Sequence, residues 1–194
     1  TVTEVKRTYK VVDGQAVVVW DIGEELPTYD YYILTTWNLS GGEFSFPPIE
    51  ASGKEHSGVI EWGDGKKEIY ADSSVSVTHS YKSAGTYTIK LWGDFSILHK
   101  ECFYQRTDLI AIDTIKSKIR DIGYRVFGLC TGLTDVKLHS MTDINSTTAN
   151  CSCFFGCAAL EEVVIPYANE YIGPSMFEKC TNLKKVTYST STVG

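Results

Sequence analysis

Apolar and polar residues alternate along much of the first half of the chain. Val75, Val77 and His79 alternate with serine and threonine, and a period of two recurs from Tyr87 to Trp92. Successive side chains of a strand point to opposite faces, so this period predicts strands with one buried face. Several short strands divided by glycine turns indicate a β-sandwich. Further strands are predicted at 31–39, 44–49 and 59–62, with a hairpin at 9–20.

The second half follows a different pattern, in which the spacing Phe-x-x-Cys-x-x-Leu-x-x-Val-x-Ile recurs. A degenerate first copy keeps Phe103, Leu109 and Ile112 but has Arg106 in place of cysteine and Thr114 at the last position. The leucines at 109, 133, 160 and 183 lie 24, 27 and 23 residues apart. The three regular copies are Phe127, Cys130, Leu133, Val136, Leu138; Phe154, Cys157, Leu160, Val163, Ile165; and Phe177, Cys180, Leu183, Val186, Tyr188.

A repeat of this length predicts a solenoid, because each unit must stack on its neighbours to bury its apolar residues. Stacked repeats supply an extended surface rather than a catalytic pocket. Arg106 places a charge at a core position, which we interpret as the polar outer face of a terminal unit. The third copy has additional small and polar residues at 146–150, where we expect a bulging loop.

Charge is distributed unevenly along the chain, whose formal net charge is −6. Residues 1–94 carry 8 basic and 14 acidic side chains, whereas residues 95–194 carry 10 of each. Neither half has the basic excess that phosphates require, so nucleic acid is not expected as a partner. No apolar run approaches the roughly 20 residues of a membrane span, and no signal segment opens the chain. We therefore expect a signal or anchor segment to be absent from this sequence.

Two family resemblances follow from these motifs. Trp62-Gly63-Asp64-Gly65, His79-Ser80-Tyr81 and Gly85-Thr86-Tyr87 resemble, in order and spacing, a PKD-type domain across residues 29–93. Such domains are immunoglobulin-like sandwiches. The later copies resemble BspA-like leucine-rich repeats across residues 95–188, because Ile172-Gly173 and Ile122-Gly123 match the lead-in of that family and Ile165-Pro166 matches its end. Together the resemblances imply short helical turns in the repeats and a secreted or surface protein of a gut bacterium.

Metal and catalytic sites were weighed against simpler interpretations. Asp64 lies between two glycines, but a calcium site needs six to eight oxygen ligands, so a hairpin turn is favoured. Cys151, Cys153 and Cys157, with His139, depart from the paired cysteine spacing of structural zinc sites. None of the four histidines stands in a nucleophilic motif. The sequence therefore predicts no catalytic residue, no metal site and no cofactor.

The six cysteines are all found at or after Cys102. Cys130, Cys157 and Cys180 occupy one repeat position, which favours a small buried side chain over disulfide pairing. A disulfide framework would be expected to spread cysteines through the whole chain. Mostly free thiols are therefore expected, and the state of Cys102, Cys151 and Cys153 is left open.

The outward-facing strand residues of the repeats are the candidate partner-binding positions. Stacking predicts two columns on the solvent face, and tyrosines near the repeat ends add aromatic candidates. The alternative is a solvated ladder of weakly paired charges, worth roughly 0–1 kcal/mol per pair. The first column is Asp135, Glu162 and Lys185, the second is Lys137, Val164 and Thr187, and the tyrosines are Tyr167, Tyr171 and Tyr188.

The sequence thus predicts a mostly β protein with two parts. Residues 1–93 are expected to form the PKD-like sandwich, with 1–28 as an extra hairpin, and residues 94–194 about four BspA-like repeats. Without a flexible linker the parts should pack rigidly. The expected function is non-catalytic, monomeric binding or adhesion at the cell surface, to a host protein or glycan. The alternatives are a spacer that binds nothing and an accessory domain of a hydrolase, and a contiguous aromatic or apolar patch would favour the binder.

Overall fold

The computed structural model describes residues 8–12, 15–19, 29–50, 56–138, 152–166 and 175–189, so the loop expected at 146–150 lies outside the described residues. The described part contains strands and no helix, and hence no helix that could span a membrane. The strands are β1 (Thr8–Val12), β2 (Gln15–Val19), β3 (Tyr32–Leu39), β4 (Gly42–Phe46), β5 (Gly58–Glu61), β6 (Lys67–Tyr70), β7 (Val77–Tyr81), β8 (Gly85–Trp92), β9 (Ile97–Leu98), β10 (Leu109–Asp113), β11 (Asp121–Ile122), β12 (Asp135–Lys137), β13 (Glu162–Pro166) and β14 (Lys185–Ser189).

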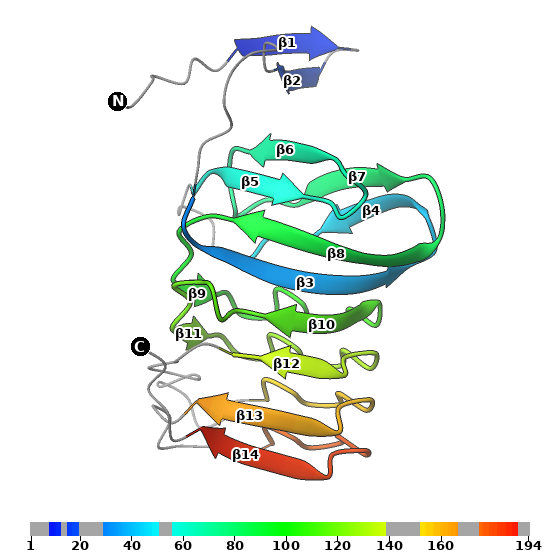
Figure 1. Cartoon of the computed structure of the whole chain (residues 1–194), viewed down its shortest axis with the longest axis vertical. Coiled ribbons are helices and arrows are strands. Elements are labelled where there is room, and N and C mark those ends of the chain that lie inside the picture. The colour runs from blue at the N-terminus through cyan, green and yellow to red at the C-terminus, as the bar shows by residue number, and fades with distance from the viewer. Residues whose placement is uncertain are drawn as a thin grey trace.

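One six-stranded sheet runs through both halves of the chain. Its strand order is β12-β10-β3-β8-β5-β6. β3 pairs with β8 antiparallel from Tyr32 to Leu39, and β5 and β6 extend the sheet beyond β8. Figure 1 shows β10 and β12 continuing the stack of strands below β3.

A second layer, formed by β4 and β7, covers the inner face of this sheet. Aromatic rings fill the space between the layers. Trp37 of β3 meets Phe44 of β4 edge-on, with 5.1 Å between ring centroids, and Phe44 also contacts Trp62 and Tyr81. In β8 the buried Ile89 and Leu91 alternate with half-buried residues, so the period of two predicted from Tyr87 to Trp92 is confirmed there. The prediction missed β6, whose short sequence Lys-Glu-Ile-Tyr has little apolar alternation.

The hairpin predicted at 9–20 is confirmed as β1 and β2, which pair from Thr8↔Val19 to Val12↔Gln15. These strands form a sheet of their own and join no other described strand. The hairpin is therefore a separate two-stranded element rather than an extension of the six-stranded sheet.

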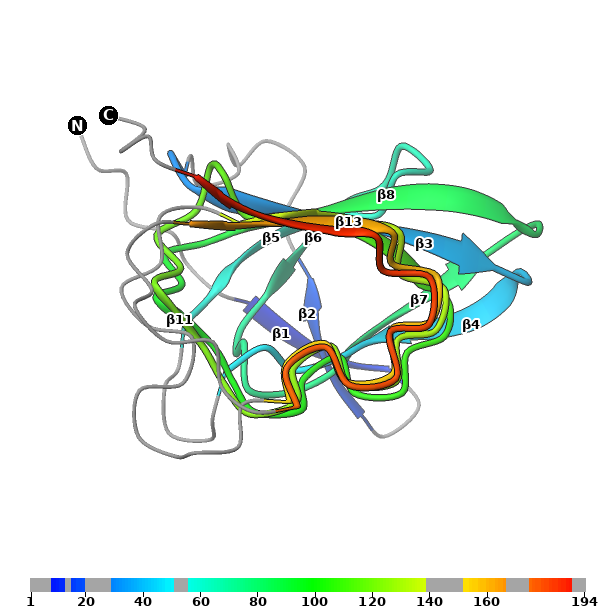
Figure 2. The same cartoon turned by 90° about the horizontal axis from the view of Figure 1, so that it is seen from below.

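The second half is a stack of repeats, as predicted. β10 and β12 pair in parallel, as do β9 and β11 and β13 and β14. Figure 2 looks along the stack and shows the backbones of successive repeats superposed. Each repeat contributes one strand to the same side of the stack, and its turns lie across from that strand.

The repeat phenylalanines form a ladder through the centre of the stack. Neighbouring rings lie 5.8, 5.2 and 5.5 Å apart between centroids, and their planes differ by no more than 15°. Phe103, Phe127 and Phe154 are 0% exposed. Phe177 packs against the same core but is only partly buried. The ladder thus packs each copy against the next.

A second ladder, of cysteine thiols, runs beside the first. The Sγ of Cys130 donates to the carbonyl oxygen of Phe103 at 2.9 Å, and Cys157 donates to that of Phe127 at 3.0 Å. Cys180 repeats the contact with Phe154 at 2.9 Å. Each of these carbonyls also accepts a backbone amide of its own turn, so the thiol adds a second hydrogen bond that joins one copy to the next. The predicted inner column is confirmed, although Cys180 is only half-buried.

These thiols should resist alkylation in the folded protein. Burial raises the pKa of Cys130 to about 12 and also raises that of Cys157, so the reactive thiolate is scarce. We expect mass spectrometry to find Cys130 and Cys157 labelled by iodoacetamide only in denaturant. Denatured protein is the positive control for each peptide, and rapid labelling of either thiol in the native protein would contradict the ladder.

The short helical turns implied by the family resemblance are not seen among the described residues. Residues 101–105 and 124–129 instead form hydrogen-bonded turns. Gln105 and Leu129, two residues after the ladder phenylalanines, have φ values of 61° and 59°. A left-handed residue at this point cannot continue a right-handed helix, which is why the turn stops there.

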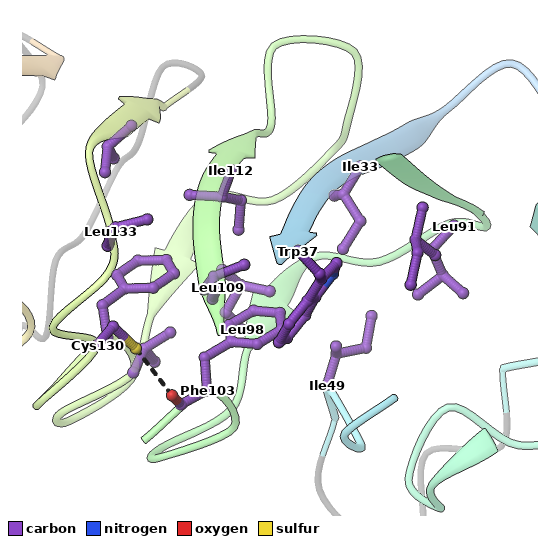
Figure 3. Close-up of a cluster of buried hydrophobic side chains, with 14 of the residues drawn as sticks. Ile33, Trp37, Ile49, Leu91, Leu98, Phe103, Leu109, Ile112, Cys130 and Leu133 are labelled. Atoms are coloured by element: carbon purple, nitrogen blue, oxygen red, sulfur yellow. Dashed lines mark hydrogen bonds between the residues drawn. The ribbon is translucent and has the colours of Figure 1, made fainter. Parts of the chain in front are cut away.

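The first repeat is joined directly to the sheet of the first half. β10 pairs antiparallel with β3, and Ile112 lies opposite Thr35, with a register shift between Leu109 and Ala111. Side chains from both halves form one hydrophobic core across this junction. Figure 3 shows Ile33, Trp37, Ile49 and Leu91 of the first half beside Leu98, Phe103, Leu109 and Ile112 of the repeats.

Arg106 does not provide the polar end of the stack that the sequence suggested. Its guanidinium lies over the rings of Trp37 and Phe44, at 4.5 and 5.0 Å from their centroids. It also donates to the carbonyl oxygen of Ser45 at 3.0 Å and binds Asp108 through two nitrogens. The first repeat is therefore covered by strands of the first half, and Arg106 is a contact between the halves.

The three motifs that suggested a PKD-type domain converge in space. Trp62 stacks on His79 with 4.7 Å between centroids, and the Tyr81 hydroxyl donates to the Trp62 carbonyl at 2.8 Å. Asp64 contacts His79 Nε2 at 3.0 Å and accepts the Lys66 amide at 3.0 Å. The predicted turn, in which Asp64 binds nearby backbone, is confirmed. The PKD resemblance itself stays a prediction.

This cluster should make stability depend on pH. Burial raises the pKa of Asp64, but hydrogen bonds from His79 and the Lys66 amide outweigh it, so the pKa lies below the ordinary 3.8. A carboxyl with a depressed folded-state pKa stabilises the protein above its unfolded pKa, and this stabilisation is lost as the pH falls through the folded value. Asp64→Asn should therefore lower the free energy of unfolding at neutral pH, and its difference from the unmodified protein should shrink below about pH 4.

Urea unfolding followed by tryptophan fluorescence at several pH values measures this difference. Asp30→Asn, at an exposed position, is the matched control and should change stability little at any pH. A deficit in Asp64→Asn that stayed constant down to strongly acidic pH would contradict the contribution of the carboxylate.

Candidate functional site

The predicted strand columns lie on one exposed face of the repeats. Pairing of β13 with β14 sets Glu162 opposite Lys185 and Val164 opposite Thr187, as the columns required. In β12, Asp135 and Lys137 point to the same side as each other and away from buried Val136. All six column residues are exposed.

The charges of this face neutralise one another. Lys185 lies 3.8 Å from Glu162, with both side chains more than 60% exposed, and Lys137 lies 3.3 Å from Asp135. Exposed pairs of this kind contribute about 0–1 kcal/mol and are screened by salt. Val164 is the one exposed large apolar side chain among the described residues of β12, β13 and β14. The strand face therefore carries a solvated charge ladder and no contiguous apolar patch in its described part.

The three candidate tyrosines cannot be placed as a patch. Tyr167 and Tyr171 lie outside the described residues. The backbone of Tyr188 lies in β14 opposite Ile165, but its side chain also falls outside the description. Their role in binding stays a prediction.

Three half-buried aromatic rings do gather around one arginine elsewhere, along the turns of three successive repeats. The guanidinium carbon of Arg125 lies 5.0 Å from the ring centroid of Tyr124, 5.6 Å from that of Phe155 and 6.0 Å from that of Tyr104. Lys179 Nζ lies 4.9 Å from the ring centroid of Phe155, which thus has a second cation beside it. We call these five residues the cation–aromatic strip: Tyr104, Tyr124, Arg125, Phe155 and Lys179.

Repeat geometry explains why these side chains meet. Tyr104 and Phe155 directly follow the ladder residues Phe103 and Phe154, so stacking brings their turns close together. The second copy has Gly128 at this position, where an added Cβ would lie 3.0 Å from the Tyr104 ring. Gly128 thus makes room for Tyr104 to turn toward Arg125.

Arg125 is the chemically distinctive member of the strip. Among the described residues its side chain has no ion-pair or hydrogen-bond partner, and its Nε is buried. Ring faces attract the cation by about 0.5–1 kcal/mol each at exposed sites, but they do not accept its N–H donors with the strength of a carboxylate. The strip can therefore offer flat aromatic contact and a guanidinium ready to bind an anion.

The sequence interpretation missed the strip because it followed strand positions only. The signal was present in the register, since the residues just after two of the repeat phenylalanines are aromatic. The meeting of Arg125 with Tyr104 and Phe155, however, joins three copies and depends on how their turns stack.

In a second aromatic cluster, on the outer face of the six-stranded sheet, the polar groups already have partners within the protein. Lys90 Nζ lies 3.8 Å from the ring centroids of both Tyr32 and Trp92. Glu61 accepts hydrogen bonds from Trp92 and Lys67 at 3.1 and 2.6 Å. Burial raises the pKa of Glu61, but these hydrogen bonds and the charges of Lys67 and Lys90 lower it by more. The pKa of Glu61 therefore lies below its ordinary value. Glu61 thus occupies the indole N–H of Trp92, and the rings of Tyr32 and Trp92 contact each other with 4.8 Å between centroids, whereas Arg125 of the strip has no anionic partner among the described residues.

The described residues supply no group of three or more His, Cys, Asp or Glu able to hold a metal. Cys151 and His139, weighed as zinc ligands, lie outside the described residues. Glu50 binds both His56 Nδ1, at 2.6 Å, and the Ser73 hydroxyl. Ser73 directs its proton to the carboxylate, whereas a nucleophile would direct it to an imidazole base.

Comparisons with known proteins concern the repeat half of the chain. A model of the family described as BspA type leucine rich repeat region (6 copies) matches residues 96–193. No curated protein matched.

Two solved structures were found to be similar. One is a leucine rich cell surface protein from Faecalibacterium prausnitzii, with 24% identity and a TM-score of 0.34, covering 50% of this chain and 30% of that one. The other is the leucine rich repeat protein of T. pallidum, with 21% identity and a TM-score of 0.32, covering 46% of this chain and 50% of that one. This chain thus spans half or less of the length of either.

The family match extends over half of the chain, and it coincides with the copies that carry the phenylalanine and cysteine ladders. The chain belongs to the family of BspA-type leucine-rich repeat proteins.

Proposed function

We propose that this protein is a non-catalytic binding module of a cell surface, and that the cation–aromatic strip is its partner-binding site. The observation that carries the proposal is the continuity of the strip: three half-buried rings around one arginine that has no anionic partner among the described residues. Aromatic residues and arginine are the types most enriched at the energetic centres of protein interfaces. A contiguous aromatic surface is also the feature that favours a binder over a spacer.

The proposed location at the surface has separate support. The solved protein from Faecalibacterium prausnitzii is described as a cell surface protein, and this chain belongs to a repeat family whose members the sequence resembles at the lead-in and end of each copy. We extend the proposal to a secreted or surface-displayed, monomeric adhesin-like protein of a gut bacterium, with a host protein or glycan as its partner.

We also propose that residues 29–93 are a PKD-type domain. The support is the convergence of its three motifs, in which Trp62 stacks on His79 and Asp64 contacts the same imidazole. In this proposal the domain covers the first repeat and holds the strip at a fixed angle, because β3 and β10 belong to one sheet.

The rival function is that of a spacer that binds nothing. The continuous core across the junction favours it, since a rigid body can hold neighbouring domains apart as well as present a ligand site. The two functions differ in one respect: only the binder requires the strip.

An array of host-matrix proteins and glycans, probed with the purified chain, tests the proposal. We expect the chain to bind at least one ligand on the array. The double variant Tyr104→Ala/Phe155→Ala should bind that ligand with an affinity at least tenfold lower. The matched control is Lys185→Ala/Thr187→Ala on the exposed strand face, which should bind normally. Circular dichroism verifies that both variants are folded. Binding that disappears only in the strand-face variant would assign the function to that face, and an array without any ligand would favour the spacer.

A further inference from the structure

We infer that the strip binds an acidic side chain of a protein partner, and that Arg125 receives its carboxylate through the two terminal nitrogens of the guanidinium. This inference rests on the proposed function, because it names the chemistry of the partner at the same site. It starts from a comparison of the two arginines that lie over aromatic rings in this structure, Arg106 and Arg125.

Arg106 shows the complete form of the arrangement. Its guanidinium lies over Trp37 and Phe44, while its Nε and Nη2 donate to the two carboxylate oxygens of Asp108 at 3.0 and 2.9 Å. Ring contact fixes the plane of the guanidinium, and the paired hydrogen bonds use the edge that the rings leave free. Paired hydrogen bonds between a guanidinium and a carboxylate are among the strongest hydrogen bonds in proteins, because both groups are charged.

Arg125 has the rings without the carboxylate. Its guanidinium lies among Tyr104, Tyr124 and Phe155, yet the Nε that Arg106 uses for Asp108 is, in Arg125, buried and without a partner among the described residues. Because this Nε has no accessible surface, a partner cannot reach it. The two terminal nitrogens of Arg125 also have no partner among the described residues but keep accessible surface, so they can donate a pair of hydrogen bonds to an incoming carboxylate.

The backbone does not explain the choice of arginine at this position. Arg125 has φ of 51°, and the equivalent residues of other copies are Glu101, with φ of 59°, and Ser175, with φ of 64°. Side chains of three different kinds thus occupy the same left-handed position. Glu101 is a carboxylate in the preceding copy, but no ion pair joins it to Arg125 among the described residues.

The surroundings favour a protein carboxylate over an anionic polysaccharide. The strip has two cations, whereas long polyanions bind rows of many basic side chains. The first half, which packs against the repeats, carries the whole net charge of −6 and would repel a polyanion. A single Asp or Glu beside apolar residues would match one arginine and three rings.

Selection of random peptides displayed on phage, with the folded chain as bait, tests the inference. We expect enriched peptides to contain Asp or Glu next to an apolar residue. Synthetic copies should bind at least tenfold more weakly to Arg125→Gln, and a Glu→Gln or Asp→Asn change in the peptide should have the same effect. Arg125→Lys should restore only part of the affinity, since an ammonium cannot form the paired bonds. Glu101→Gln is the matched control and should keep or strengthen binding.

The outcomes separate this inference from the proposed function. Peptides that bind the strip, shown by loss in Tyr104→Ala/Phe155→Ala, but bind Arg125→Gln equally well would overturn the acidic partner and leave the binding function intact. Binding of heparin that depends on Arg125, with no enrichment of acidic peptides, would also overturn the inference in favour of a glycan. Failure of all probes at the strip would overturn both.

Discussion

Phe154→Ala should lower the free energy of unfolding by about 3–5 kcal/mol, which is the range for deletion of a fully buried phenylalanine. Phe154 is 0% exposed and stacks on both sides, 5.2 Å from Phe127 and 5.5 Å from Phe177. Its removal would leave a cavity between two copies that their hydrogen-bonded turns keep at a fixed separation, so little collapse can occur. Urea unfolding followed by circular dichroism measures the change.

Two further phenylalanines provide matched controls. Phe103→Ala should have an effect as large as Phe154→Ala, because Phe103 is fully buried between Phe127 and the rings of Trp37 and Phe46 in the first half. Phe177→Ala should have a smaller effect, because Phe177 is only partly buried in the described structure. A small effect at Phe103 together with a large one at Phe154 would restore the interpretation of the first copy as an exposed end.

Trp37→Ala should destabilise both halves of the protein together, by about 3–5 kcal/mol. Trp37 is fully buried and contacts Phe44 on one side and Phe103 of the first repeat on the other, and Arg106 lies over its ring. Because one core spans the junction, loss of this ring should affect the sheets of the first half and the repeats in a single transition.

The distribution of residue types allows the two halves to be followed separately. All tryptophans lie before residue 94 and all cysteines after residue 100, so tryptophan fluorescence reports the first half and thiol labelling of Cys130 reports the repeats. In Trp37→Ala, the fluorescence of Trp62 still reports the unfolding of the first half. In Trp37→Ala we expect the fluorescence curve and the thiol-labelling curve to coincide, with a midpoint at a lower urea concentration than in the unmodified protein. Val75→Ala, at an exposed position, should shift neither curve. Two separate transitions in the unmodified protein would contradict the shared core.

Sequence alone was sufficient for the features that depend on local period. The spacing of Phe127, Cys130 and Leu133, repeated in the later copies, predicted the stack and its inner columns, because identical units placed in register must bring identical positions together. The alternation from Tyr87 to Trp92 predicted the buried face of β8 for a similar reason: the strand period of two does not depend on the neighbouring chain.

Only the tertiary structure determines which side chains meet between the two halves and between different copies of the repeat. Arg106 was interpreted as an exposed end because its copy is degenerate, but the antiparallel pairing of β10 with β3 places it against Trp37. The cation–aromatic strip was not predicted, since Tyr104, Arg125 and Phe155 come from three copies and meet only through the stacking of their turns. A repeat pattern states which positions are equivalent, whereas the side chain that one copy directs toward the next depends on backbone conformation and on the space left by residues such as Gly128.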